Sequence, residues 1–135
     1  LHVEADYLAH EISYDNFDFI VIPGGKYVAK IIKDDKHIKE AASYFFKQKK
    51  LVAAICAGPR FLGQAGLLDY KTFTCYKGSE IDMPKGIYAP HKESIVDGNI
   101  ITARGAGAVY EFAYAIVNYL LGEEKAESLL KNILY

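Results

Sequence analysis

The feature that most constrains the fold is an apolar run that ends in a cysteine and then in a proline suited to start a helix. Residues 51–55 read Leu-Val-Ala-Ala-Ile, and Cys56-Ala-Gly-Pro59 follows directly. A second aliphatic run, from Asp18 to Ile22, stops at Pro23-Gly24-Gly25. Both runs lack strict alternation of apolar and polar residues, which is typical of strands covered on two faces. We therefore predict two buried strands, each followed by a tight turn.

A helix and a hairpin complete the pattern around these strands. Between them, apolar side chains recur at helical spacing from Ile38 to Phe45. A strand, helix, strand unit has a right-handed crossover, which makes its two strands parallel and neighbours or near neighbours. Further on, Asp97-Gly98 separates two short apolar runs, residues 94–96 and 99–102, and this dipeptide predicts an antiparallel hairpin.

The remaining segments fit the same class of fold. Pro59 opens a predicted helix, residues 72–75 form a brief predicted strand, and two amphipathic helices follow Gly107. Residues 77–93 are predicted to be irregular. Strands that alternate with helices indicate an α/β fold, here a flavodoxin-like or Rossmann-like three-layer sandwich with a mostly parallel sheet and a hairpin at 94–102. The length fits a single domain over residues 1–135.

The predicted topology locates a site before any chemistry is assigned. In parallel α/β sheets, ligands bind beyond the carboxyl ends of the strands. Four segments are expected to converge there: Pro23-Gly24-Gly25, Cys56-Ala57-Gly58, Cys75-Tyr76 and Arg104-Gly105.

Cys56 is the residue in this set with the clearest chemistry. The sequence Ala54-Ile-Cys-Ala-Gly58 resembles a nucleophile elbow, whose usual form is Gly-x-Ser-x-Gly, with cysteine in the place of serine. The amides at the start of the following helix favour a thiolate, the reactive form of the thiol. The backbone amides of Gly25 and Ala57 could together hold an oxyanion. The alternative is that Cys56 only packs in the interior, as many free cysteines do.

The other polar candidates leave more than one interpretation open. Cys75 could resolve an oxidised Cys56 into a disulfide or could be a passive core residue. Arg104 could pair with a substrate carboxylate or with a protein carboxylate. The four histidines match no metal-ligand spacing, so no metal is expected, and only His91 could reach the site as a base.

Composition limits the kinds of partner that the protein is expected to bind. The formal net charge of -1 gives no basic excess for nucleic acid, and no apolar stretch is long enough to cross a membrane. Two cysteines do not make a disulfide framework, which favours a cytoplasmic location. No cofactor is expected, because Tyr110 stands where the loop Gly105-Ala-Gly107 would need its third dinucleotide-binding glycine.

At the elbow and at the other segments predicted to converge on the site, the sequence resembles the ThiJ/PfpI superfamily, in the branch of the Parkinson-disease-linked deglycase. The resemblance runs from about Asp18 to Tyr135. Its motifs are Phe17–Gly25, Ala53–Pro59, Thr74–Tyr76, Val96–Gly107 and Glu111–Ala113.

The resemblance implies a reactive Cys56 with the amides of Gly25 and Ala57 around it and a pocket lined by Gly24, Cys75, Tyr76, Arg104 and Gly105. Relatives are described as glutathione-independent glyoxalases, deglycases, oxidation sensors and chaperones, and they are commonly homodimers. The family also has an N-terminal strand, helix, strand segment whose glutamate hydrogen-bonds the sulfur. Residues 1–15 do not resemble it, so we expect an N-terminally truncated domain that forms a homodimer or associates with that segment.

Three functions follow as hypotheses. The first is a glyoxalase or deglycase that adds Cys56 to the carbonyl of an α-oxoaldehyde or acts on its adducts. The second is a sensor or chaperone with an oxidisable Cys56. The third, a cysteine amidase or peptidase, is weakened because the protease-like branch places a histidine where this sequence has Ala57.

Overall fold

The computed structural model describes residues 2–135 and is built around a four-stranded sheet. Its strands are β1 (Phe19–Ile22), β2 (Leu51–Ile55), β5 (Ser94–Asp97) and β6 (Ile100–Ala103). They lie in the order β1-β2-β6-β5, with β1, β2 and β6 parallel and β5 antiparallel to β6. The predicted parallel pair and the predicted hairpin are both confirmed.

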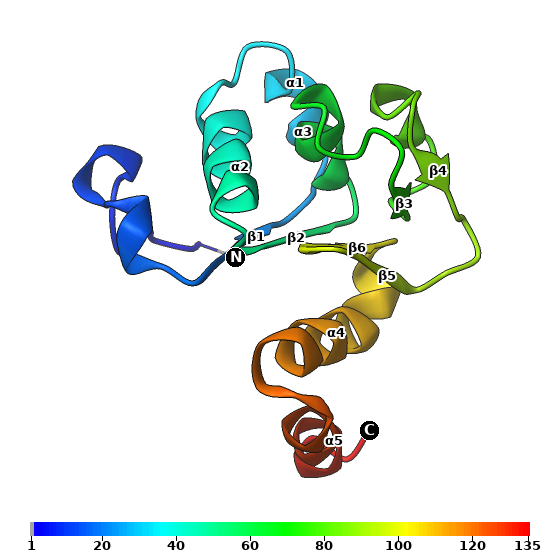
Figure 1. Ribbon diagram of the computed structural model, residues 1–135. Helices are drawn as coiled ribbons and strands as arrows, with labels where there is room; N and C mark the ends of the chain where they lie inside the picture. The colour runs from blue at the N-terminus through cyan, green and yellow to red at the C-terminus, as the bar shows by residue number, and fades with distance from the viewer. Residues whose placement is uncertain (1) are drawn as a thin grey trace.

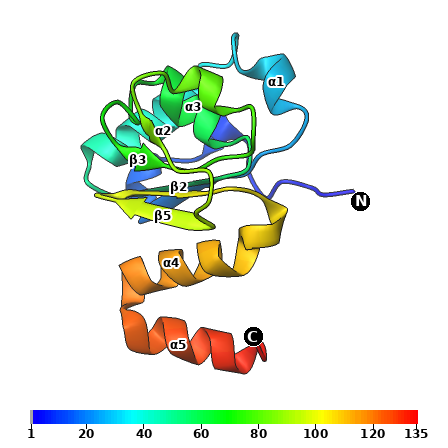
Figure 2. The same ribbon diagram turned by 90° about the vertical axis from the view of Figure 1, so that its right-hand side faces the viewer.

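Helices cover both faces of this sheet (Figures 1 and 2). On one face lie α1 (Val28–Ile31), α2 (His37–Lys47) and α3 (Pro59–Gln64). On the other face lies α4 (Val109–Leu121), and α5 (Glu123–Asn132) packs on the outer side of α4. Single 3-10 turns occur at Ala9–Glu11, Tyr14–Asn16, Glu80–Asp82 and Ala106–Ala108. The α/β class with a mostly parallel sheet is therefore confirmed; the short α1 was not predicted.

The sheet separates two apolar cores because successive residues of a strand face opposite ways. Val52 and Ala54 of β2 face the larger core, which also contains Phe45 and Phe61. Leu51 and Ala53 face the smaller core, where the side chains of α4 that cover them are Phe112 and Ala115. β2 is thus covered on both faces, as its continuous apolar run indicated.

The predicted strand at residues 72–75 needs correction. β3 (Thr72–Phe73) stops at Phe73 and pairs in parallel with β4 (Ile87–Tyr88), in a separate two-stranded sheet. The amide of Thr74 donates to the side-chain hydroxyl oxygen of Thr102 at 3.0 Å, and the amide of Thr72 donates to the carboxylate of Asp97 at 2.8 Å. Thr102 and Asp97 belong to the hairpin, and their side chains accept these hydrogen bonds. The segment 72–75 therefore runs beside the main sheet and adds no strand to its backbone hydrogen-bond ladder. β4 lies in the segment that was expected to be irregular.

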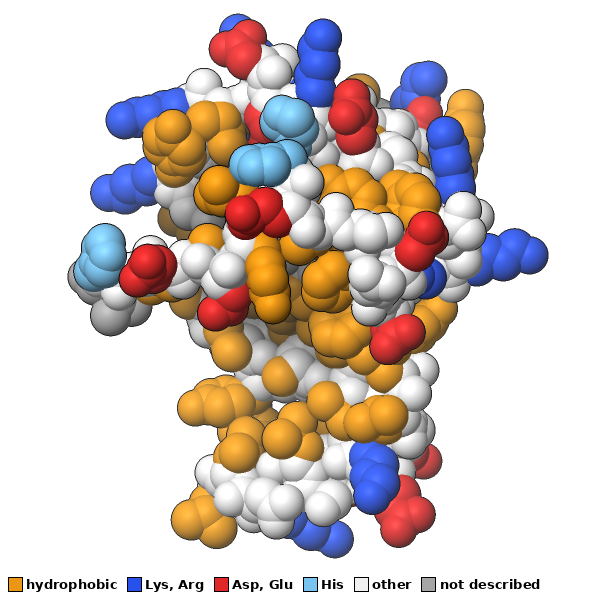
Figure 3. All heavy atoms as spheres, turned by 90° about the vertical axis from the view of Figure 1, so that its left-hand side faces the viewer, with side chains coloured by type: hydrophobic (Ala, Val, Ile, Leu, Met, Phe, Trp, Pro, Cys, Tyr) orange, Lys and Arg blue, Asp and Glu red, His pale blue; other side chains and the backbone are white. Residues whose placement is uncertain are grey.

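β1 is an edge strand of the described sheet, and one of its faces is incompletely covered. Ile20 and Ile22 face the larger core, so Phe19 and Val21 point to the α4 side. These two side chains remain 39% and 43% exposed. Hydrophobic side chains are visible between the upper helical layer and the α4–α5 pair when the molecule is viewed from this edge (Figure 3). Among the described residues, no helix is both long and apolar enough to span a membrane.

Candidate active site at the end of strand β2

Cys56 has the backbone conformation of a nucleophile elbow. Its φ is +64°, in the left-handed region that a residue with a side chain seldom adopts. β2 ends at Ile55 and α3 begins at Pro59, so this strained residue lies between a buried strand and a helix. A sharp turn from strand to helix presents the nucleophile above the sheet in enzymes that use this motif.

Two glycines allow the surrounding backbone to pack closely against this turn. A Cβ atom on Gly24 would lie 2.5 Å from the amide nitrogen of Ala57 and 2.8 Å from the Cβ of Cys56. A Cβ atom on Gly58 would lie well under 3.0 Å from the carbonyl oxygen of Ile22. Both contacts would be prohibitive for any other residue, so the ends of β1 and β2 meet because glycine occupies these positions.

Hydrogen bonds fix the elbow to two further segments. The amide of Cys56 donates to the carbonyl oxygen of Ala103 at 2.9 Å, which links the elbow to the end of β6. The amide of Tyr76 donates to the carbonyl oxygen of Cys56 at 2.8 Å. The 75–76 segment therefore reaches the elbow as predicted, although it arrives as a loop and not as the end of a strand of the main sheet.

A cavity of about 410 Å³ opens beside Cys56. Four of the residues expected at the site line it, namely Gly25, Cys56, Ala57 and Tyr76. Four further residues that the sequence analysis missed complete the lining: Lys26, Ala29, Arg60 and Ser79.

Arg60 and Asp82 connect the cavity to the long segment after β3. The Arg60 guanidinium forms an ion pair with the Asp82 carboxylate, whose second oxygen accepts a hydrogen bond from the Gln64 amide group at 2.9 Å. Arg60 comes directly after Pro59, which opens α3. Its place in the first turn of the helix that follows Cys56 could have indicated from the sequence that it lies at the site. Lys26 and Arg60 give the cavity two positive charges, one of them paired.

Cys75 lies next to this site but differs from Cys56 in its exposure to solvent. Its side chain is 2% exposed, whereas Cys56 is partly exposed. Burial, followed by the nearby charges of Glu80 and Cys56, raises the pKa of Cys75 to about 12, against a smaller opposing effect of a hydrogen bond with Tyr88. Cys75 is therefore a protonated thiol at neutral pH.

The lining of this cavity does not include the other candidate residues, Gly24, Arg104, Gly105 and His91. Arg104 turns to Glu93, with a nitrogen-to-oxygen distance of 3.2 Å between guanidinium and carboxylate. Gly105 lies beside Tyr76, since a Cβ atom there would be 3.7 Å from that ring. Gly24 packs behind the elbow, and His91 is exposed in the segment before β5. Within residues 2–135, no group of three His, Cys, Asp or Glu side chains could hold a metal ion.

The fold and the elbow define an α/β protein with a partly exposed cysteine between a buried strand and a helix. The chain belongs to the DJ-1/PfpI family, whose profile matches residues 1–119. The solved structure of Drosophila melanogaster DJ-1beta superposes with a TM-score of 0.89 at 30% identity, covering 99% of this chain and 73% of that one.

Curated relatives carry more than one functional name. The chain is 35% identical over 127 residues to the glutathione-independent glyoxalase DJR-1.2 of Caenorhabditis elegans and 34% identical over 119 residues to the deglycase PfpI of Pyrococcus furiosus. These matches cover 93% and 87% of this chain. They span 67% and 71% of those relatives, and a match to the Parkinson disease protein 7 homolog of Danio rerio, 38% identical over 82% of this chain, spans 59% of that protein.

Proposed function

We propose that the protein acts on α-oxoaldehydes or their adducts through a covalent hemithioacetal on Cys56, as a glyoxalase or deglycase. The observation that carries the proposal is the left-handed elbow at Cys56, which opens on a cavity of about 410 Å³. The names of relatives at 34% and 35% identity support the choice of carbonyl chemistry over other uses of a cysteine nucleophile.

The proposed reaction begins with addition to the aldehyde. The Cys56 thiolate forms a carbon–sulfur bond to the aldehyde carbon of methylglyoxal, and the carbonyl oxygen takes up a proton to give the hemithioacetal. Transfer of the proton from this carbon to the neighbouring ketone carbon, through an enediol, gives a thioester. Water then cleaves the thioester, which releases lactate and regenerates the Cys56 thiol without any external oxidant or reductant.

The cavity supports the negative charge that develops on oxygen during the addition. Gly25 and Ala57 line it together with Cys56, and we assign their amides to the oxyanion. Lys26 and Arg60 add positive charge to the same wall. The resemblance implies that the base for proton transfer is a glutamate of the family's N-terminal segment.

The test is lactate formation from methylglyoxal by the full-length protein with the family's N-terminal segment, compared with Cys56→Ala and Cys75→Ala in the same protein. We expect Cys56→Ala to lose activity by a factor of about a thousand or more, because covalent catalysis needs the sulfur. Cys75→Ala is the matched control and should keep activity within a few fold, since Cys75 is a buried neutral thiol. Equal rates for the unchanged protein and Cys56→Ala would contradict the proposal.

The oxidation-sensor alternative receives less support from this site. A resolving cysteine attacks a sulfenic acid as its thiolate, and the raised pKa of Cys75 keeps that residue protonated. We therefore place carbonyl chemistry first.

A further inference from the structure

The cavity beside Cys56 contains more hydrogen-bond donors than a single developing oxyanion uses. The amides of Gly25 and Ala57 are assigned to that oxyanion. The described lining also includes two basic side chains, Lys26 and Arg60, and no acidic one. A ligand with a second anionic group, separate from the reacting carbonyl, is complementary to this wall.

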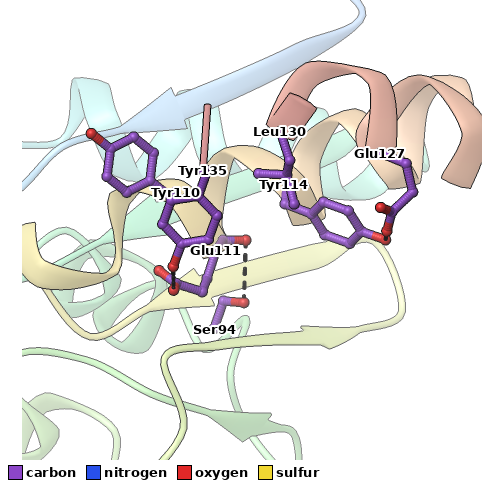
Figure 4. Close-up of a pocket in the computed structure, with 7 residues that line it drawn as sticks. All are labelled: Ser94, Tyr110, Glu111, Tyr114, Glu127, Leu130 and Tyr135. Carbon is purple, nitrogen blue, oxygen red and sulfur yellow. Dashed lines mark hydrogen bonds between the residues drawn. The ribbon is translucent and has the colours of Figure 1, made fainter. Parts of the chain in front are cut away.

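The charged side chains of a second cavity, about 300 Å³ in volume and located between α4 and α5, are engaged within the protein (Figure 4). The Tyr135 hydroxyl donates to the carboxylate of Glu111. The Tyr114 hydroxyl donates to the carboxylate of Glu127 at 3.0 Å. Of these two cavities, the one beside Cys56 therefore has the charged groups that remain free for a ligand.

Arg60 is held by one side of its guanidinium and keeps the other side free. Its Nε donates to the Asp82 carboxylate, whose second oxygen accepts a hydrogen bond from the Gln64 amide group at 2.9 Å. The two terminal nitrogens of Arg60 form no hydrogen bond with an acceptor in residues 2–135, and neither is fully buried. These nitrogens are therefore accessible donors at a fixed place in the lining.

Lys26 supplies a second positive charge. None of the ion pairs formed within residues 2–135 includes Lys26, which is an exposed residue. The carboxylate of Glu80, next to Ser79 in the chain, accepts a hydrogen bond from the amide of Gly78 at 2.7 Å and is not part of the lining. The charge of Lys26 is therefore available to an anion in the cavity.

Ser79 provides an independent indication that a polar ligand group belongs here. The residue is only 7% exposed, and its amide donates to the carbonyl oxygen of Tyr76 at 2.9 Å, but its hydroxyl has no partner within residues 2–135. The hydroxyl is not among the fully enclosed polar atoms of this part of the chain, so it reaches the cavity that Ser79 lines. Hydroxyls of buried residues are normally hydrogen-bonded, so this one calls for a polar group from a ligand.

We propose that the cavity selects α-oxoaldehydes, or their adducts, that carry a carboxylate or phosphate at the end remote from the aldehyde. Lys26, the terminal nitrogens of Arg60 and the hydroxyl of Ser79 hold this oxyanion. A guanidinium presents parallel N–H groups that match two oxygens of a carboxylate or phosphate. The volume of about 410 Å³ is within the range for small-molecule cavities. This inference rests on the proposed function, because it names the substrate class of the same site.

The first experiment compares two five-carbon α-oxoaldehydes as substrates of the full-length protein. The anionic substrate is 4,5-dioxopentanoate, and its neutral counterpart is 2-oxopentanal. The reaction proposed above converts them to 2-hydroxypentanedioate and 2-hydroxypentanoate. We expect kcat/KM to be about tenfold or more higher for the anionic compound. The phosphate ester of 3-hydroxy-2-oxopropanal tests the other oxyanion, and the anionic compound with the larger kcat/KM identifies the group that the site prefers.

Lys26→Gln tests the site without changing the sulfur. We expect this variant to lower the preference for 4,5-dioxopentanoate over 2-oxopentanal by about threefold or more, because it removes a charge that holds the remote carboxylate. An effect on the developing oxyanion cancels in this ratio, since both substrates form the same kind of hemithioacetal. Lys30→Gln, at an exposed position of α1 outside the lining, is the matched control and should keep the ratio. Ser79→Ala should lower the ratio in the same direction as Lys26→Gln.

A binding measurement separates failure of this inference from failure of the proposed function. The ketones 4-oxopentanoate and 2-pentanone lack the aldehyde, so saturation-transfer NMR with the full-length protein reports their binding alone. We expect 4-oxopentanoate to bind about tenfold or more tightly than 2-pentanone. If this difference is found and no α-oxoaldehyde is turned over, the proposed function fails and the oxyanion site stands. Equal binding of the two ketones, equal kcat/KM for 2-oxopentanal and both anionic substrates, or equal effects of Lys26→Gln and Lys30→Gln would overturn the inference.

Discussion

The two cysteines lie at the ends of neighbouring segments, yet their surroundings are opposite. Cys56 follows β2 in a left-handed conformation, partly exposed on a cavity with positively charged groups. Cys75 follows β3 in the interior, and burial raises its pKa to about 12. Both thiols belong to short turns after strands, so neither residue type nor position after a strand distinguishes them. The backbone conformation and the solvent exposure do.

The difference arises from how each strand is held. The end of β2 is clamped between β1 and β6 by close backbone contacts at Gly24 and Gly58, and the sharp turn must push its side chain outwards. The segment after β3 is held by the side chain of Thr102, outside the main ladder. The side chain of Cys75 can therefore turn inwards, where it packs in the larger core.

The largest expected difference between the two cysteines is their rate of alkylation. At pH 7.5 a thiol with a pKa of about 12 is thiolate in roughly 3 of 100,000 molecules, and only the thiolate reacts. We expect iodoacetamide to modify Cys56 at least a hundred times faster than Cys75, as measured by peptide mass mapping over time. In denaturant the two rates should converge. Comparable rates in the native protein would remove the contrast between the two sites.

The close packing at the end of β2 can be broken by one methyl group. Gly58→Ala would place a Cβ atom against the carbonyl oxygen of Ile22, and backbone cannot move aside as a flexible side chain can. We expect the free energy of unfolding to fall by about 2–3 kcal/mol, measured by urea denaturation. Gly107→Ala is the control, because a Cβ atom there meets nothing within 4 Å, and its effect should stay within about 0.5 kcal/mol. Similar losses in both variants would show that the contact at Gly58 is not special.

The buried state of Cys75 predicts a smaller effect, on the pH dependence of stability. Because its pKa is raised on folding, the folded protein holds this proton more tightly than the unfolded chain does. The resulting stabilisation is complete below the unfolded pKa, near 8.5, and is lost as the pH rises towards the folded value of about 12. The free energy of unfolding should fall by up to about 1.4 kcal/mol per pH unit in this range from Cys75 alone.

Cys75→Ala measures this contribution together with that of its neighbour Tyr88, because Cys75 is one of the groups that raise the pKa of Tyr88. The other tyrosines with raised pKa values have causes that do not involve Cys75, so their contribution cancels in the difference. We expect a shallower fall of stability between pH 9 and pH 11 in the variant, measured by urea denaturation at each pH. Identical pH profiles would mean that Cys75 is not buried as a neutral thiol in solution.

Much of the fold was predictable because its signals are local. The apolar run at 51–55, the turn at Asp97-Gly98 and the helical stripe within 37–47 each follow from neighbouring residues alone. The segment 72–74 was not predictable in the same way, since the amides of Thr72 and Thr74 bond to the side chains of Asp97 and Thr102, which come much later in the chain. The candidate site follows the same division: the elbow was visible in the sequence, whereas Lys26, Arg60 and Ser79 were missed as lining residues.

The sequence by itself determined the class of fold, the place of the elbow and the choice of Cys56, because strand, turn and helix preferences act over a few adjacent residues. Only the tertiary structure decided that Cys75 is a buried neutral thiol and that Arg104 turns to Glu93. Burial and charge are sums over neighbours that are distant in the chain. The same residue type therefore acquires its pKa and its partners only when the chain has folded.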